Sequence, residues 1–145
     1  MQRSQILLIY VLVASVLVAS TFAVITIQKN IPGAGSIKGV GLGIYWDPQC
    51  INETSSIDFG LLEAGSSKDF TLYLENQGNT DLTLNMATKN WNPNEAADYI
   101  SLTWNREGQK ISADQVISFV ISLSVSSNIQ DVSSFNLDIT IYGTG

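Results

Sequence analysis

A long apolar run at the start of the chain constrains this protein more than any other feature of its sequence. Residues 6–27 form a stretch of 22 positions without a charged side chain. As an α-helix with a rise of about 1.5 Å per residue, this run would be about 33 Å long, enough to cross a hydrocarbon core of about 30 Å. The sequence therefore predicts one transmembrane helix in contact with membrane lipid, preceded by a short tail at residues 1–5.

A cleaved secretory signal peptide is the alternative interpretation of the same run. Arg3 supplies the basic start of such a peptide, and Thr21 and Ala23 supply the small residues that precede a cleavage site after Ala23. The apolar run nevertheless continues to Ile27, which is long for a signal peptide. We therefore favour an uncleaved signal-anchor, with cleavage near Ala23 as the alternative.

The orientation of the predicted helix depends on two further features. The positions of the basic residues scarcely distinguish the two possible membrane orientations, because Arg3 lies before the run and Lys29 after it. The triplet Asn52-Glu53-Thr54 matches the N-glycosylation pattern, which is used in exported domains. Asn52 is therefore a candidate glycosylation site, and the sequence favours a single-pass protein of the cell membrane whose C-terminal domain lies outside the cytoplasm.

The rest of the chain is acidic and poor in chemically reactive residues. Beyond residue 36 it carries all 13 acidic residues and five basic ones, a net charge of −8. An acidic surface repels phosphate backbones, which argues against nucleic-acid partners. The chain has no histidine, the commonest general base and metal ligand, and one cysteine, so no disulfide forms within it. These features argue against an enzyme and indicate no cofactor, metal or small-molecule substrate.

The chain after the apolar run divides into a linker and one domain. Residues 28–39 contain Pro32 and three glycines among small and polar residues, which predicts a flexible linker. An irregular first strand is the alternative, because residues 37–40 can already be extended. Residues 40–145 are long enough for one β-sandwich domain.

Seven segments of this domain alternate between apolar and polar side chains, as strands with one buried face do. They are residues 40–46, 57–59, 69–76, 82–86, 99–104, 116–126 and 134–142. The turn residues Asn76-Gln77-Gly78-Asn79 favour a hairpin between the third and fourth segments. Seven strands at this spacing predict an all-β antiparallel sandwich.

A short helix is predicted between the fourth and fifth segments. Asn92 is placed to cap it, Pro93 suits its first position, and Glu95 is placed to reach back to the cap. Calcium binding by the neighbouring asparagines and Asp98 is less favoured, because the glycine and glutamate of an EF-hand loop are missing at the required spacing.

Part of the domain resembles a known family. The residues that carry the resemblance are Asp58-Phe59-Gly60, Gly65-Ser66, Phe70-Thr71-Leu72 and Asn76-Gln77-Gly78-Asn79. They look like the start of an immunoglobulin-like sandwich of the ASPM/SPD-2/Hydin and major-sperm-protein type. With its anchor, the whole chain is similar to small surface proteins found mainly in archaea. The resemblance implies a seven-stranded immunoglobulin-like fold and an interaction or structural module; the N-terminal anchor departs from the mostly cytoplasmic or ciliary eukaryotic members.

Three residues are candidates for an interaction patch: Trp46, Trp91 and Cys50. Both tryptophans are predicted near loops, where an aromatic ring is available to a partner. Cys50 is either a buried small hydrophobe, which we favour, or a thiol that pairs with a neighbouring subunit. Trp104 differs from them because it lies on an alternating segment and is predicted to be in the core.

These observations predict a non-catalytic, membrane-anchored, extracytoplasmic module that binds another protein or its own copies, or supports the cell envelope. A secreted, pilus-like filament subunit is the alternative function. In that hypothesis, cleavage near Ala23 frees residues 24–27 as an apolar strand that completes a neighbour's sheet.

Overall fold

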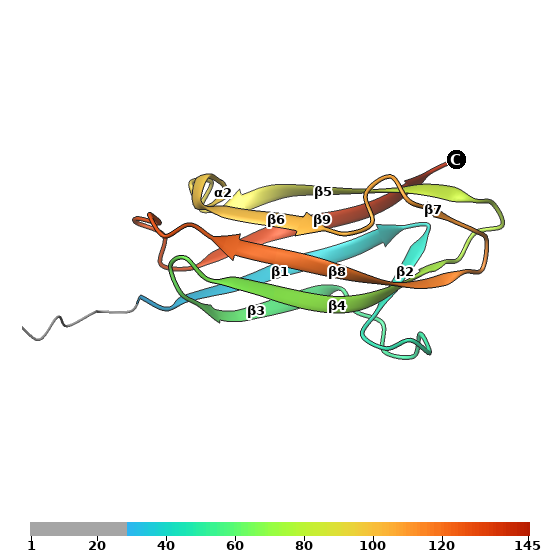
Figure 1. Ribbon diagram of the computed structural model, residues 1–145, viewed down its shortest axis with the longest axis horizontal. Helices are drawn as coiled ribbons and strands as arrows, with labels where there is room; N and C mark the ends of the chain where they lie inside the picture. Colours follow the sequence, from blue (N-terminus) through green and yellow to red (C-terminus); the bar gives the residue numbers. More distant parts are fainter. Residues whose placement is uncertain (1–28) are drawn as a thin grey trace, which may run out of the picture.

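The computed structural model describes residues 29–145, which fold into two β-sheets packed face to face (Figure 1). The predicted tail at 1–5, the apolar run at 6–27 and the cleavage site near Ala23 lie outside the described residues. Within residues 29–145, no helix is both long and apolar enough to cross a membrane.

The two sheets share one apolar core. One sheet has five strands in the order β3-β1-β9-β5-β7, and the other has four in the order β2-β4-β8-β6. The bounds are β1 Ile31–Val40, β2 Leu42–Tyr45, β3 Ser56–Leu62, β4 Ser67–Asn76, β5 Leu82–Asn92, β6 Ile100–Trp104, β7 Lys110–Ile111, β8 Val116–Val125 and β9 Phe135–Thr144, with one short helix, α2, at Ala96–Tyr99. The predicted all-β sandwich is confirmed, but the described residues contain nine strands instead of seven.

The strands with the clearest alternation are the ones that the sequence places correctly. In β8, the side chains of Phe119, Ile121 and Leu123 are completely buried, while Val120 and Ser122 between them lie on the outer, half-exposed face. In β9, Leu137 and Ile139 alternate with polar residues in the same way. A two-residue period suffices here because each strand has one face on the core and one in solvent.

The predicted linker at 28–39 is wrong for most of its length, because Ile31–Val40 forms β1. This strand lies inside the five-stranded sheet, antiparallel to β3 and parallel to β9, so the prediction of a purely antiparallel sandwich is also wrong. Gly33 and Gly35 face the core, where the rings of Phe135 and Phe59 occupy the space that larger side chains would need. The glycines thus serve close packing, whereas in the sequence they indicate flexibility.

The chain passes from one sheet to the other at Gly41, which has a φ of +71°. This residue divides the predicted strand at 40–46 into the end of β1 and the separate strand β2. Leu42 and Ile44 are buried as predicted, but Trp46 lies beyond β2 and is 43% exposed instead of sharing their face. A positive φ is easily reached only by glycine, which explains why the switch occurs here.

The predicted hairpin between residues 69–76 and 82–86 is wrong, because β4 and β5 belong to different sheets. The connection between them is held by Asn76, which is fully buried at the end of β4. Its side-chain nitrogen donates to the carbonyl oxygens of Thr80 at 2.8 Å and Ser112 at 3.1 Å, and its Oδ1 accepts from Gly78 N–H at 3.0 Å. These bonds tie the β4–β5 connection to the β7–β8 connection.

The short helix exists, but its predicted start is wrong. Asn92 is the last residue of β5, and the Asn92–Pro93 peptide bond is cis. Helix α2 begins at Ala96, and Glu95 occupies the cap position without a side-chain hydrogen bond. The helix joins β5 to β6 and so carries the chain between the sheets.

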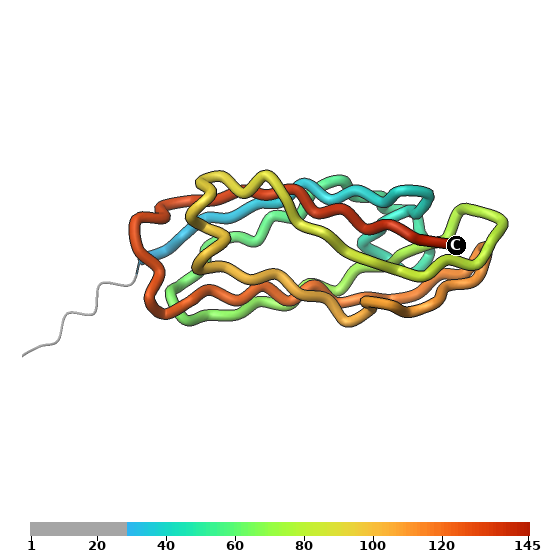
Figure 2. Tube along the Cα trace, turned by 90° about the horizontal axis from the view of Figure 1, so that it is seen from above, coloured from blue at the N-terminus to red at the C-terminus, as the bar shows by residue number. Residues whose placement is uncertain are grey.

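The parallel pairing of β1 with β9 determines where the described chain enters and leaves the sandwich. Both strands run in the same direction, with Gly33 opposite Phe135 and Val40 opposite Tyr142. The first described residues therefore lie at one end of the elongated domain, and residue 145 lies at the other (Figure 2).

Candidate functional site

The loop between β2 and β3, residues 46–55, brings together three of the four predicted site residues: Trp46, Cys50 and Asn52. It projects beside the sheets as the largest excursion on that side of the domain (Figure 1). Many surface loops of this length are irregular, whereas this loop has a defined shape that is set by its own hydrogen bonds.

The Asp47 carboxylate organises the loop from within. One of its oxygens accepts the backbone N–H of Gln49 at 3.1 Å, and the other accepts that of Asn52 at 2.7 Å. The Ile51 N–H lies 3.2 Å from both oxygens. These N–H groups, that of Asn52 above all, hold the pKa of Asp47 below its usual value because they stabilise the charged carboxylate.

Backbone bonds close the loop on itself and fasten its second half to β2. Trp46 N–H donates to Asn52 O at 3.0 Å, and Thr54 N–H donates to Ile44 O at 2.9 Å. Tyr45 and Glu53 form an isolated antiparallel bridge. The loop is therefore a hydrogen-bonded extension of the sandwich with a fixed outline, and its side chains are presented in a defined arrangement.

Two large apolar side chains are exposed on this loop. Trp46 is 43% exposed and Ile51 is 77% exposed, the largest exposed fraction among the large hydrophobic residues of the described chain. Ile51 was missed in the sequence because an isolated isoleucine between polar residues follows no period. Exposed aromatic and aliphatic side chains on a preorganised loop suit a protein contact, because little conformational freedom is lost on binding.

Cys50 lies at the turn of the loop with a φ of +56° and is half-buried. Burial raises the pKa of its thiol, and the negative charges of Glu75 and Asp47 raise it further. The thiol is therefore kept protonated, which makes it a poor nucleophile. This environment agrees better with the small-hydrophobe interpretation than with intermolecular pairing, which stays a prediction for Cys50.

A polar contact behind the loop fixes the end of β2. The Tyr45 hydroxyl donates to Glu75 Oε2 at 3.0 Å and accepts from Gln77 Nε2 at 2.9 Å. Burial, together with the bond to Glu75, raises the pKa of Tyr45. This network connects β2 to β4 and the β4–β5 connection, and so supports the loop from below.

Trp91 does not join this patch. It lies on β5 in the other sheet, half-buried, and its ring stacks on Phe135 with centroids 6.1 Å apart and planes at 24°. Phe135 stacks in turn on Phe59 at 6.0 Å, and Phe59 meets Phe70 edge to face at 5.4 Å. Trp91 is thus the outer member of an aromatic row in the core. Its position near a predicted loop was misleading because β5 extends to Asn92.

The side chain of Asn52 is exposed, as a glycosylation site requires, and Thr54 is half-buried. The Thr54 hydroxyl donates to Ser56 O at 2.8 Å. The triplet therefore lies on the surface of an ordered loop, and glycosylation of Asn52 stays a prediction.

No protein-family model matches this chain, and no curated protein matches it.

Proposed function

We propose that this chain is a non-catalytic, single-pass membrane-anchored module that holds an immunoglobulin-like sandwich outside the cytoplasm, where it binds protein or supports the cell envelope. The immunoglobulin-like character is supported by the family resemblance of the segment from residue 57 to residue 84, and by the two-sheet architecture. The anchor rests on the length of the apolar run at 6–27.

The observation that carries the proposal is the direction of β1. This strand begins at Ile31, only four residues beyond the apolar run, and runs parallel to β9. With residues 6–27 in the membrane, the end of the sandwich where β1 starts is held at the lipid surface. The opposite end, where β9 finishes, points away from it (Figure 2).

The loop at 46–55 supplies the proposed protein contact. Trp46 and Ile51 present apolar surface on a backbone that Asp47 already holds in place. The contact is proposed for the loop alone, because Trp91 belongs to the core on the other sheet.

The filament alternative has less support. In strand donation, the accepting domain has a gap in its sheet that the donor fills. Here β1 already lies between β3 and β9 in the five-stranded sheet. Residues 24–27 would have to join another position, at an edge.

Alkaline carbonate extraction of membranes from cells that express the full chain tests the anchor. We expect the protein to stay in the membrane pellet. Its intact mass should include residues 1–23. In a separate experiment, protease added to intact cells should degrade the domain. Release into the supernatant together with loss of residues 1–23 would overturn the anchor. Full protection from protease would overturn the extracytoplasmic orientation.

A further inference from the structure

The edges of the two sheets differ in how their backbone groups are satisfied. An edge strand presents a row of N–H and C=O groups that can pair with another strand, and proteins commonly block such rows. In the described chain the outer strands are β3 and β7 in one sheet and β2 and β6 in the other.

The edge of β3 is blocked by a lysine from the opposite sheet. Lys68 occupies a position of β4 in phase with the core-facing Phe70 and Leu72. Its ammonium donates to Phe59 O at 2.9 Å and to Leu61 O at 3.3 Å, two carbonyls of β3. Lys68 is exposed, and its ammonium occupies two carbonyls that another strand would need for pairing with β3.

The edge of β2 is also covered, and β5 is covered as far as Met86; β7, the outer strand of that sheet, has only two residues, one of them Lys110. The loop at 46–55 pairs with β2 through the Tyr45–Glu53 bridge and the bond from Thr54 N–H to Ile44 O. Beyond the short pairing of β5 with β7, the carboxylate of Glu107 accepts Met86 N–H at 3.1 Å.

The edge of β6 has no such cover within residues 29–145. Ser126 N–H donates to Tyr99 O. The backbone N–H and C=O groups of every second residue, counted from Tyr99, therefore point toward β8. The backbone groups of Leu102 and Trp104 therefore point away from β8, and β6 has no other strand partner in the described chain. The strand carries no charged residue, and the side chains of Ser101 and Thr103 are exposed.

The first half of β4 is another open stretch, but its charges disfavour pairing. β2 pairs only with residues 73–76, which leaves Ser67 to Leu72 open on that side. Two copies pairing antiparallel about this stretch would bring Asp69 near its own copy and Lys68 near its own copy. The uncharged β6 carries no such penalty.

We propose that β6 is a self-association edge that pairs antiparallel with β6 of a second copy of this chain, centred on Leu102. In this register the Leu102 N–H groups bond the Leu102 carbonyls of the other copy, and each Trp104 N–H bonds the other copy's Ile100 carbonyl. The bonds use the groups that face away from β8. The two four-stranded sheets then become one continuous sheet with an isologous interface.

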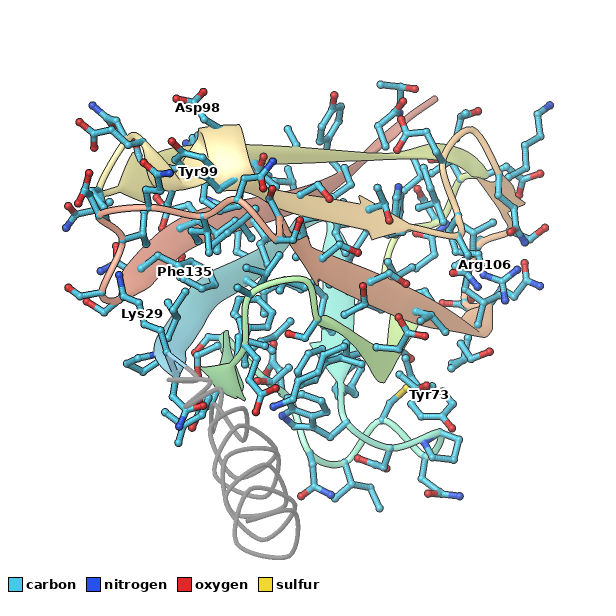
Figure 3. The ribbon with its side chains drawn as sticks, turned by 60° about the vertical axis from the view of Figure 1, so that its left-hand side comes forward. Lys29, Tyr73, Asp98, Tyr99, Arg106 and Phe135 are labelled. Carbon is cyan, nitrogen blue, oxygen red and sulfur yellow. The ribbon has the colours of Figure 1, made fainter. Side chains whose placement is uncertain are left out.

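Charge at the two ends of β6 fits this arrangement. Asp98 lies just before the strand and Arg106 just after it, at opposite ends (Figure 3). In the Leu102-centred antiparallel register, Asp98 of each copy lies opposite Arg106 of the other, whose guanidinium also donates to Ser118 O and Gln109 Oε1 within its own domain. This opposition of Asp98 and Arg106 favours the antiparallel over the parallel direction of pairing between two copies.

The inference rests in part on the proposed function, because five residues of edge give a weak contact in dilute solution. Chains held in one membrane by residues 6–27 meet at a raised effective concentration, which strengthens such a contact. The proposed partner of the module is therefore its own copy in the same membrane.

Site-directed disulfide formation in the full-length chain tests the pairing. Both chains carry Cys50→Ser, which removes the native thiol. One tagged chain also carries Ser101→Cys, and a second chain with a different tag carries Thr103→Cys. The two chains are reconstituted together in phosphatidylcholine vesicles and oxidised. These two positions face each other in the Leu102-centred register, where a disulfide is geometrically suited. We expect mixed dimers to form several-fold faster than dimers of either chain with itself.

Matched cysteines at Ser67 and Thr71 on β4 serve as the control for random collision. Equal cross-linking of the β4 and β6 pairs would overturn the proposal, as would faster coupling of the Thr103→Cys chain with itself. Failure of cross-linking in a chain that carbonate does not extract overturns the pairing and leaves the anchor intact. Cross-linking by a chain that carbonate extracts overturns the anchor alone.

A charge variant gives an independent measurement. The double variant Ser101→Lys/Thr103→Lys places lysines opposite lysines in the proposed pairing without touching the core. We expect self-association in phosphatidylcholine vesicles, measured by energy transfer between labelled chains, to weaken roughly tenfold. The control Ser67→Lys/Thr71→Lys makes the same change in charge on β4. An equal effect of both variants, with unchanged thermal melting, would overturn the assignment to β6.

Discussion

Strands β1 and β8 both lie inside their sheets, yet they fill the core in opposite ways. β8 contributes Phe119, Ile121 and Leu123, which are completely buried. β1 contributes isoleucines at its start and at Ile37, but between them it places glycines beneath aromatic rings from β3 and β9. One strand supplies core volume, and the other supplies space for the side chains of its neighbours.

The largest expected effect comes from removing volume supplied by β8. Phe119→Ala leaves a cavity where the ring contacts Trp104 edge to face at 5.8 Å. We expect a loss of about 3–5 kcal/mol in the free energy of unfolding, measured by urea denaturation. The exposed neighbour Ser118→Ala is the control, and a similar loss there would contradict this account of β8.

The matching test in β1 adds volume. In Gly33→Ala, the new Cβ would lie 2.3 Å from the Phe135 ring, which Phe59 and Trp91 hold between them. We expect a loss of about 1–3 kcal/mol from overpacking. In a Phe135→Leu background, Gly33→Ala should lower the free energy of unfolding by less, because the leucine side chain is smaller than the ring. Urea denaturation measures both losses. If the losses from the two substitutions simply add, the packing explanation is contradicted.

A second glycine of β1, Gly35, should give a smaller loss of stability than Gly33 when it is replaced by alanine. In Gly35→Ala, the added Cβ would lie 3.2 Å from the Phe59 ring and 3.3 Å from Ile139, a contact relieved by shifts of a few tenths of an ångström. We expect a change of less than about 1 kcal/mol, smaller than that of Gly33→Ala. Thermal melting of the two variants side by side provides the measurement, and a reversed order would refute the graded packing of β1.

The smallest expected effect concerns pH and the outer face of β1. Two residues donate to the Asp138 carboxylate on β9: Ser36 on β1, and Asn90 at the irregularity of β5 between Lys89 and Asn92. These bonds, that of Ser36 first, hold the pKa of Asp138 below its usual value. A lowered pKa in the folded state contributes stability above the unfolded pKa, and this stability is lost as pH falls through the folded pKa. Asp138→Asn should remove this component of the acid dependence; an unchanged pH profile of melting would contradict it.

The candidate site was predictable only in part. Trp46, Cys50 and Asn52 are close in sequence, so their presence on one loop follows from chain connectivity. The role of Asp47 did not follow, because an aspartate before a proline usually indicates only a turn. Trp91 was misassigned because the stacking on Phe135 joins residues far apart in the chain.

The sequence by itself determined the all-β class and the inward faces of β4, β8 and β9, because a two-residue period encodes which face of a strand is buried. Tertiary structure alone decided the pairing. β4 and β5 have the pattern of a hairpin but lie in different sheets, and β1 has the composition of a linker but lies between two strands. The reason is physical: periodicity records burial, whereas strand order depends on contacts between distant residues, such as the ring of Phe135 over Gly33.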